Sequence, residues 1–178
     1  GIDVSATSVQ EARGRCRGTV HLGEVHDAPF EEGSFDRIAL FDVLAHLAHP
    51  VQTLRAVAGL LKPGGQLVLS SVNEDWPLVP FFLGLFKLLP DKTASLRDEM
   101  YETQHYCYFG SENVEQLLAQ AGLDLVRTRP LEPLSTRFFV HHYSWRRRLA
   151  MLGMSQLDRV LGSSRKMLVL ATKPASRS

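Results

Sequence analysis

Residues 27–73 read DAPFEEGSFDRIALFDVLAHLAHPVQTLRAVAGLLKPGGQLVLSSVN, and this stretch decides the fold. An apolar strand pattern occupies residues 38–41, directly after Phe35 and Asp36. Pro50 opens a helical pattern that keeps its apolar side chains on one face as far as Leu61. A Lys-Pro-Gly-Gly turn follows, and a second, nearly continuous apolar strand covers residues 66–72, as expected of a strand buried on both faces. Strand, helix and strand in this order predict one right-handed crossover of an α/β sheet.

The flanking sequence continues the alternation of strands and helices. Further strands are predicted at residues 1–4, 19–22, 123–129 and 166–172, and further helices at residues 5–13, 111–121 and 145–161. Ser5 or Thr7 is expected to cap the first of these helices and Ser111 the second, while residues 91–104 are expected to form a loop or short helix. This order predicts a largely parallel, doubly wound sheet. Ligands of such sheets bind beyond the carboxyl ends of the strands. We therefore expect Asp3, Glu24 and Phe41, each at or just past a strand end, to share one edge.

Composition narrows the class of protein. The chain has 178 residues, of which 44% are hydrophobic and 22% charged, as in an ordinary globular domain. Its net charge of +1 gives no electrostatic argument for a nucleic-acid partner. Cys16 and Cys107 have no metal-like spacing and predict a reducing, cytoplasmic setting.

Three groups of residues resemble a known family in their order and spacing. They are Gly33-Ser34-Phe35-Asp36, Leu61-Lys62-Pro63-Gly64-Gly65 and His105-Tyr106-x-Tyr108-Phe109. The sequence thereby resembles the class I S-adenosylmethionine-dependent methyltransferases, in particular the ubiquinone-biosynthesis-like and general small-molecule branch. The resemblance implies a Rossmann-like, doubly wound, mostly parallel sheet with helices on both faces and an antiparallel last strand. It also implies S-adenosylmethionine as cofactor and a small molecule as methyl acceptor, with oxygen as the first choice of acceptor atom.

The same resemblance assigns cofactor contacts to Asp3, Val4, Glu24, Val25 and Phe41. In the family, an acid at the position of Asp3 accepts hydrogen bonds from the ribose hydroxyls, for which a carboxylate is well suited. The acid that corresponds to Glu24 takes the adenine amino group, and the backbone of the next residue reads a ring nitrogen.

Two alternatives to these cofactor roles remain open at this point. Asp3 also fits a plain helix N-terminal acid, and nicotinamide-binding folds place an acid at the same point. The neighbouring Asp27 competes with Glu24, although we expect Asp27 to be a turn or cap residue.

The family's first strand and its Gly-x-Gly-x-Gly turn have no counterpart in the sequence, and we expect them upstream of Gly1. That strand is central in the family's sheet, so its absence would leave two strand edges unpaired. We predict one methyltransferase domain at residues 1–173, with an insertion at 76–104, a helical insertion at 141–162 and a disordered tail at 174–178. The hypothesis is that the chain is a carboxyl-terminal part of a methyltransferase and is not a stable enzyme alone.

Three residues are candidates for catalysis: His46, His105 and Tyr106. A sulfonium is a strong leaving group, so orientation supplies most of the catalysis and a base is needed only where a hydroxyl loses its proton. Asp42 and His46 would share one face if the turn between them were helical. This stretch resembles a metal-linked Glu-x-x-Glu-His pattern, but Ala45 replaces its second acid, and we predict no metal site. The alternatives are a structural His46 and a packed aromatic cluster around His105.

Two segments could contact a membrane, namely 78–89, which is apolar, and 145–161, which carries three consecutive arginines. The alternative is a substrate lid beside a solvated basic helix. A function from a different class, a non-catalytic binding or scaffolding domain, also remains open. A nicotinamide oxidoreductase would explain Asp3 but not Glu24 or the Pro63-Gly64-Gly65 turn.

Overall fold

A computed structural model describes residues 1–101, 105–131 and 145–175 of the chain. Its strands are β1 (Ile2–Asp3), β2 (His21–Leu22), β3 (Phe35–Phe41), β4 (Leu61–Val72), β5 (Asp124–Pro130) and β6 (Lys166–Thr172). Its helices are α1 (Ala6–Arg15), α2 (Pro50–Leu60), α3 (Val79–Leu88), α4 (Pro90–Met100), α5 (Ser111–Gln120) and α7 (Trp145–Leu161). Two short 3-10 turns, η1 (Val25–Asp27) and η2 (Leu44–His46), follow β2 and β3.

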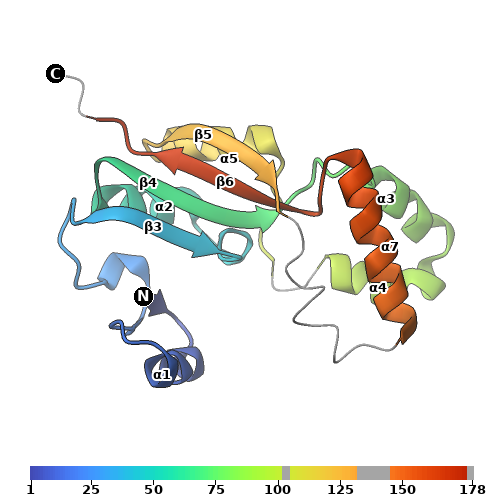
Figure 1. Ribbon diagram of the computed structural model, residues 1–178, viewed down its shortest axis with the longest axis horizontal. Coiled ribbons are helices and arrows are strands. Elements are labelled where there is room, and N and C mark those ends of the chain that lie inside the picture. The colour runs from blue at the N-terminus through green and yellow to red at the C-terminus, as the bar shows by residue number, and fades with distance from the viewer. Residues whose placement is uncertain (102–104, 132–144, 176–178) are drawn as a thin grey trace.

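The strands form two sheets (Figure 1). The larger sheet has the order β3-β4-β6-β5, while β1 and β2 form a separate parallel pair. β3 and β4 are parallel, and β6 runs antiparallel to both of its neighbours. The Rossmann-like α/β class and the antiparallel last strand are therefore confirmed.

The two sequence motifs that flank the crossover meet at the start of β3 and β4. Phe35 pairs with Leu61, and the Lys62 ammonium donates to the Asp36 carboxylate at 2.8 Å. Gly64 has a φ of 77°, which favours glycine. A Cβ on Gly65 would lie 2.8 Å from the Lys62 carbonyl oxygen, closer than real contacts allow. These residues set the register of the parallel pair rather than a binding site.

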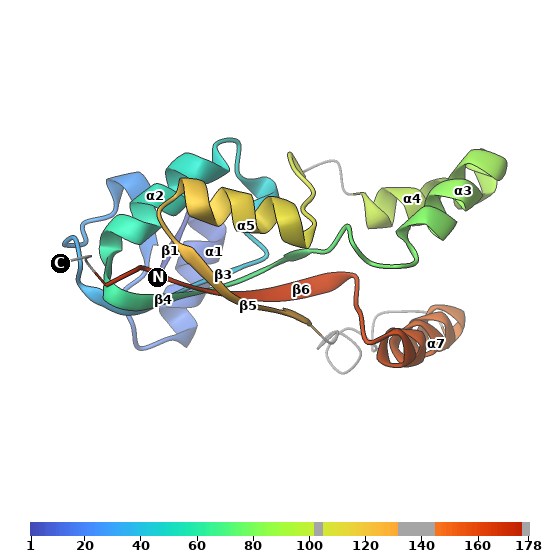
Figure 2. The same ribbon diagram turned by 90° about the horizontal axis from the view of Figure 1, so that it is seen from above.

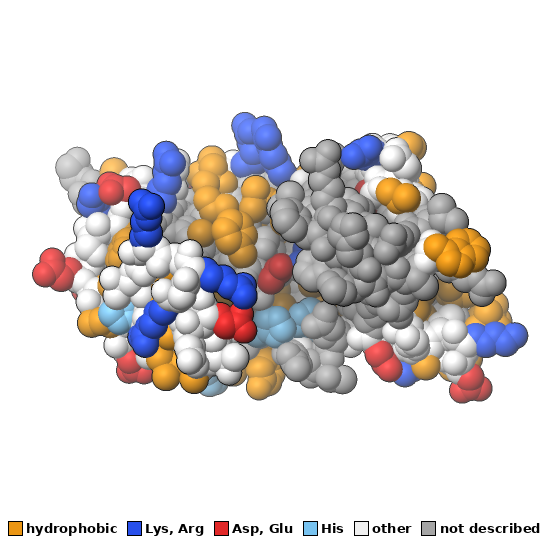
Figure 3. Space-filling view, turned by 60° about the horizontal axis from the view of Figure 1, so that its bottom comes forward, with side chains coloured by type: hydrophobic (Ala, Val, Ile, Leu, Met, Phe, Trp, Pro, Cys, Tyr) orange, Lys and Arg blue, Asp and Glu red, His pale blue; other side chains and the backbone are white. Residues whose placement is uncertain are grey.

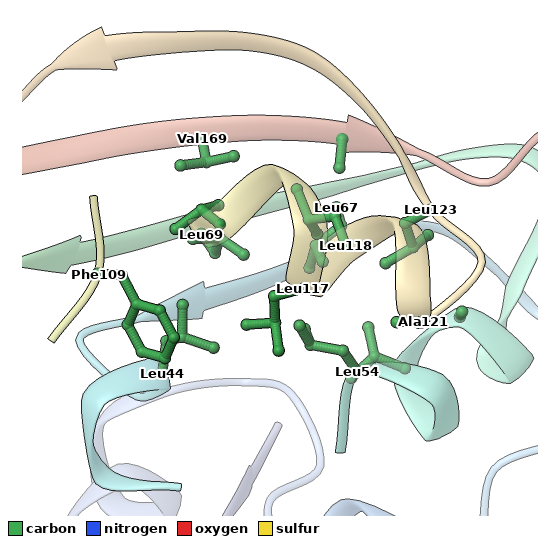
Figure 4. Close-up of a cluster of buried hydrophobic side chains, with 14 of the residues drawn as sticks. Leu44, Leu54, Leu67, Leu69, Phe109, Leu117, Leu118, Ala121, Leu123 and Val169 are labelled. Atoms are coloured by element: carbon green, nitrogen blue, oxygen red, sulfur yellow. The ribbon is translucent and has the colours of Figure 1, made fainter. Parts of the chain in front are cut away.

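The main hydrophobic core lies between the four-stranded sheet and helices α2 and α5, which cover the same face (Figure 2). Figure 4 shows Leu67 and Leu69 of β4 and Val169 of β6 together with Leu117 and Leu118 of α5. The fully buried side chains of the cluster include Leu44, Leu54, Leu67, Leu69, Leu118 and Val169. The expected face of α2, with Leu54 and Val57 inward, is confirmed.

Helix starts agree with the sequence in one case and differ in another. Ser5 caps α1, because its Oγ accepts a hydrogen bond from the Ser8 N–H at 3.2 Å. The prediction that Ser111 caps α5 is wrong, since Gly110 is the N-cap residue. The Asp75 carboxylate, which lies between β4 and α3, accepts from the Ser111 N–H instead. A carboxylate from a distant segment was not visible in the local sequence.

Helices α3, α4 and α7, here called the helical cap, lie beyond the ends of β3 and β4 (Figure 1). A second apolar cluster of Trp76, Val79, Phe82 and Phe86 holds α3 in place and is contacted by Met154 of α7. The segment 91–104, expected to be a loop or short helix, contains most of α4. Residues 102–104, 141–144 and 176–178 of the predicted insertions and tail lie outside the described residues. Within the described part, no helix is both long and apolar enough to cross a membrane.

Candidate functional site

The carboxyl ends of β1 and β2 place two of the predicted cofactor residues side by side. The Gly23 N–H donates to the Asp3 carbonyl at 3.0 Å, so Glu24 follows directly at this edge. Asp3 Oδ1 accepts the Ser5 N–H at 2.7 Å, which fixes the direction of the carboxylate. Asp3 and Glu24 are both exposed. The geometry leaves two carboxylates at one edge with oxygen lone pairs available to a ligand.

The other predicted cofactor residues have different surroundings. The Val25 side chain packs against the main core, so only its backbone is available to a ligand. Val4 is exposed beside Asp3. Phe41 ends β3 in the other sheet and is 61% exposed. η1, which carries Val25, contacts α2, and Phe30 makes an edge contact with Phe35 with ring centroids 5.1 Å apart.

The predicted catalytic histidines lie in contact. The rings of His46 and His105 have centroids 4.6 Å apart. The two chain segments are joined next to these histidines as well, because the Tyr106 N–H donates to the Ala45 carbonyl at 2.8 Å. The Tyr106 side chain is 71% exposed. The structure thus brings together residues that are about 60 positions apart in the sequence, although it does not test their catalytic roles.

The turn at residues 42–46 is not α-helical. Asp42 has a φ of 55°, and the turn η2 that follows is a 3-10 turn beginning at Leu44. Asp42 and His46 therefore do not face one side of an α-helix. Instead the Asp42 carboxylate accepts from the Ser70 hydroxyl at 3.2 Å and from the Lys166 ammonium at 2.6 Å. The described residues contain no group of three or more metal-ligand side chains.

Sequence reasoning missed Ser70 and Lys166, and it also missed Arg165. Arg165 forms an ion pair with Glu74 at 2.6 Å and lies over the ring of Tyr101, 5.2 Å from its centroid. Burial raises the pKa of Tyr101, and the negative charge of Glu74 raises it further. Arg165 also donates to the Met100 carbonyl at 3.1 Å, which ties the end of α4 to the start of β6. These contacts join distant segments, so no local motif indicates them.

The space-filling view shows the charge pattern of one face of the molecule (Figure 3). Where its residues are described, this face carries interspersed basic and acidic side chains. Hydrophobic side chains are visible at the end that carries the helical cap.

The comparison with protein families agrees with the fold. The family described as a methyltransferase domain matches residues 1–128, more than half of the chain. The chain belongs to this methyltransferase-domain family.

Individual relatives add detail. The ubiquinone biosynthesis O-methyltransferase of Aromatoleum aromaticum is 33% identical over 156 residues, which cover 79% of this chain and 66% of the relative. The chain thus spans only part of the length of the curated relatives that it matches.

Solved structures support the fold alone. A methyltransferase of Thermotoga maritima described as a possible histamine N-methyltransferase has a TM-score of 0.63 at 16% identity, covering 97% of this chain and 72% of that one. The [4+2]-cyclase SpnF has a TM-score of 0.58 at 18% identity, covering 99% of this chain and 66% of that one. The same fold therefore carries proteins with different described activities.

Proposed function

We propose that this chain is part of an S-adenosylmethionine-dependent methyltransferase that methylates a small molecule, with oxygen as the acceptor atom. The observation that carries the proposal is the family match over residues 1–128, which includes the adjacent carboxylates of Asp3 and Glu24. The choice of oxygen follows the O-methyltransferase of Aromatoleum aromaticum. Nitrogen is the competing acceptor atom, as in the description of the Thermotoga maritima protein.

The residues at the edge of β1 and β2 fit the cofactor in their donor and acceptor chemistry. Asp3 offers carboxylate oxygens to the two ribose hydroxyls, and its contact with the Ser5 N–H fixes their direction. Glu24 accepts from the adenine amino group, while the Val25 backbone pairs with the ring. Gly23 has a φ of 138° and open space around it, so the backbone can approach a ligand closely. Val4 and Phe41 supply apolar contacts.

We assign the contacts with the methyl acceptor to His46, His105 and Tyr106. S-adenosylmethionine, when bound, supplies a methyl group on a sulfonium and is therefore reactive without acid catalysis. The protein's task is to align the acceptor for in-line displacement and to take its proton. His46 is the proposed base, and His105 orients its ring through their contact. Tyr106 reaches the acceptor with its hydroxyl or ring face.

The first experiment is calorimetric titration of the chain with S-adenosylhomocysteine, the demethylated product. Saturable binding is expected, with at least about tenfold weaker affinity in Glu24→Ala, because a hydrogen bond to a charged group contributes about 1.5–3 kcal/mol. Asp27→Ala is the matched control, since Asp27 lies three residues away in η1 and should leave affinity unchanged. Equal losses in both variants, or no binding by the wild type, would contradict the cofactor assignment.

The catalytic assignment needs its own test. His46→Ala should fold normally, keep its affinity for S-adenosylhomocysteine and lose most of its turnover. A general base contributes roughly 10²–10⁴-fold to the rate, so the loss is expected within that range. Unchanged turnover with intact folding would leave His46 as a structural residue that ties the turn to His105.

A non-catalytic binding domain is the second candidate, and the [4+2]-cyclase shows only that this fold also carries a protein with a different described activity. It would bind S-adenosylhomocysteine or a related nucleoside without methyl transfer to any acceptor. The nicotinamide alternative is tested by titration with NADH, where no calorimetric response is expected.

Peripheral membrane contact through residues 78–89 and 145–161 is a further part of the proposal, as is a cytoplasmic location. Phe81 and Leu88 of α3 and Val160 of α7 are 62%, 77% and 83% exposed. Exposed apolar side chains beside a basic segment are what an anionic lipid surface attracts. Co-sedimentation with phosphatidylglycerol vesicles is expected, with little binding to phosphatidylcholine alone. Equal sedimentation of Val160→Asp and wild type would contradict a role of α7.

A further inference from the structure

Asp42 has an unusual backbone conformation at the carboxyl end of β3. Among the residues that the structure describes, it is the non-glycine residue with a positive φ, 55°. A left-handed conformation costs a non-glycine residue about 1–2 kcal/mol, although aspartate tolerates it better than most. Such a conformation persists only where neighbouring groups hold it, so Asp42 must be held by its contacts.

Two neighbouring strands hold Asp42. The Asp42 N–H donates to Ser70 Oγ at 3.0 Å, and the Ser70 hydroxyl in turn lies 3.2 Å from Asp42 Oδ1. The Lys166 ammonium donates to Asp42 Oδ2 at 2.6 Å. Ser70 in β4 is 1% exposed, and Lys166 is the first residue of β6. Both oxygens of the carboxylate are engaged, which fixes its orientation as well as its position.

The direction of the chain after Asp42 determines where His46 lies. Leu44 and Ala45, which follow Asp42, are buried in the main core and leave little freedom to compensate for a change at Asp42. The Ala45 carbonyl receives the Tyr106 N–H, and the His46 ring contacts His105. A rotation at Asp42 would therefore move the proposed base relative to the segment 105–109.

The ion pair itself contributes little to stability. The Lys166 and Asp42 side chains are 44% and 53% exposed, and exposed pairs typically contribute about 0–1 kcal/mol. Removal of this ion pair should therefore leave folding stability nearly unchanged, so that an effect on the histidine pair can be measured separately.

We propose that Asp42, held by Ser70 and Lys166, is a positioning residue that aims the His46–His105 pair at the methyl acceptor. The part of this inference that concerns the acceptor rests on the methyltransferase function proposed above. Lys166 acts through Asp42 and not on the substrate. Removal of the Lys166 ammonium should lower turnover and change cofactor affinity much less, since Asp3 and Glu24 lie at the end of the separate β1–β2 pair and only Phe41 of the proposed cofactor contacts adjoins Asp42.

The test compares Lys166→Met with Lys62→Met. Lys62 is as exposed as Lys166 and forms an ion pair with Asp36 at 2.8 Å at the opposite end of β3 and β4, which makes it a matched control, although Asp36 is more exposed than Asp42. The readouts are the melting temperature, affinity for S-adenosylhomocysteine, kcat and KM for the acceptor, and the ¹H–¹³C imidazole signals. His46→Gln and His105→Gln assign two of the signals among the seven histidines of the chain.

Lys166→Met is expected to shift the His46 and His105 signals and to lower kcat about tenfold, since small misplacements of reacting groups are costly. Lys166→Arg should restore both, whereas Lys62→Met should alter neither. Unchanged histidine signals in Lys166→Met, or equal shifts in Lys62→Met, would overturn the positioning role. If the wild type neither binds S-adenosylhomocysteine nor transfers methyl groups, the proposed function fails, and the histidine signals still decide whether Asp42 positions the pair.

Discussion

The two faces of the four-stranded sheet differ in burial although both are built from apolar residues. The face toward α2 and α5 carries Leu67, Leu69, Met167 and Val169, each at most 1% exposed. Val68, Leu168 and Leu170 alternate with them along the same strands and are only partly buried. A nearly continuous apolar strand can be buried on both faces. The helices that pack against each face decide how much of its apolar surface is removed from water.

The expectation that residues 66–72 are buried on both faces is therefore met on one face. In the described part of the chain, α2 and α5 lie together on the first face, and the second face has no such pair of helices (Figure 2). Ser70 also lies on the second face, but it is buried there and hydrogen-bonds to Asp42.

The largest effect is expected from a matched pair of valine substitutions. Val169→Ala removes two carbons from the fully buried face and should lower the free energy of unfolding by about 2 kcal/mol, including the cavity that remains. Val68→Ala makes the same change on the second face and should cost less than about 1 kcal/mol. Urea denaturation measures both, and equal losses would break the comparison by showing that the second face is covered in solution.

The next effect concerns the cap that holds α5 on its face of the sheet. Asp75→Ala removes the carboxylate that accepts the Ser111 N–H and should cost about 1 kcal/mol. Gly110→Ala should act in the same direction, because an added Cβ would collide with the Asp75 carboxylate. Asp91→Ala, an acid in the first turn of α4 without a capping contact among the described residues, is the control. No loss in Asp75→Ala would mean that α5 does not depend on this cap.

A smaller, pH-dependent effect is expected where α7 covers the Trp76 cluster. The Trp76 Nε1–H donates to Asp158 Oδ1 at 2.7 Å, and burial raises the pKa of Asp158 above its ordinary 3.8. The folded protein then holds this proton more tightly than the unfolded chain, so its contribution to stability is fully present below pH 3.8 and is lost as pH rises through the raised pKa. Asp158→Asn keeps the acceptor oxygen and removes the titration.

The stability of Asp158→Asn relative to wild type should therefore increase with pH above 3.8 and then level off. Melting temperatures across this range measure the difference. A constant difference at all pH values would contradict the raised pKa, and a large loss at every pH would mean that the amide cannot replace the carboxyl as acceptor for Trp76.

Much of the fold was predictable because its signals are local. The turn at Gly64 and Gly65, the first position of α2 at Pro50 and the Ser5 cap follow from backbone preferences of single residues. The N-cap of α5 was not predictable in this way, because its acceptor comes from Asp75, 36 positions earlier in the chain.

The candidate site was predictable only in part, for a similar reason. The strand pattern places Asp3, Glu24 and Phe41 at or just past strand ends, as the structure has them, but Phe41 lies in a different sheet from Asp3, and the cofactor roles of all three stay a prediction. The contact between His46 and His105 and the support of Asp42 by Lys166 depend on how segments more than 50 residues apart pack. The left-handed conformation of Asp42 was not predictable either, because it depends on contacts with Ser70 and Lys166 in two other strands.

The smallest effect on stability is expected at Phe41, which is the most exposed large apolar residue of the second face. Phe41→Ala should change the free energy of unfolding by less than about 0.5 kcal/mol, because a side chain that is 61% exposed loses little burial. Its affinity for S-adenosylhomocysteine should fall several-fold if Phe41 contacts the cofactor. A loss of stability above 1 kcal/mol would place Phe41 under cover and weaken the contrast between the faces. A loss of affinity without a loss of stability would instead mean that Phe41 is exposed on the second face because it contacts a ligand and not a helix.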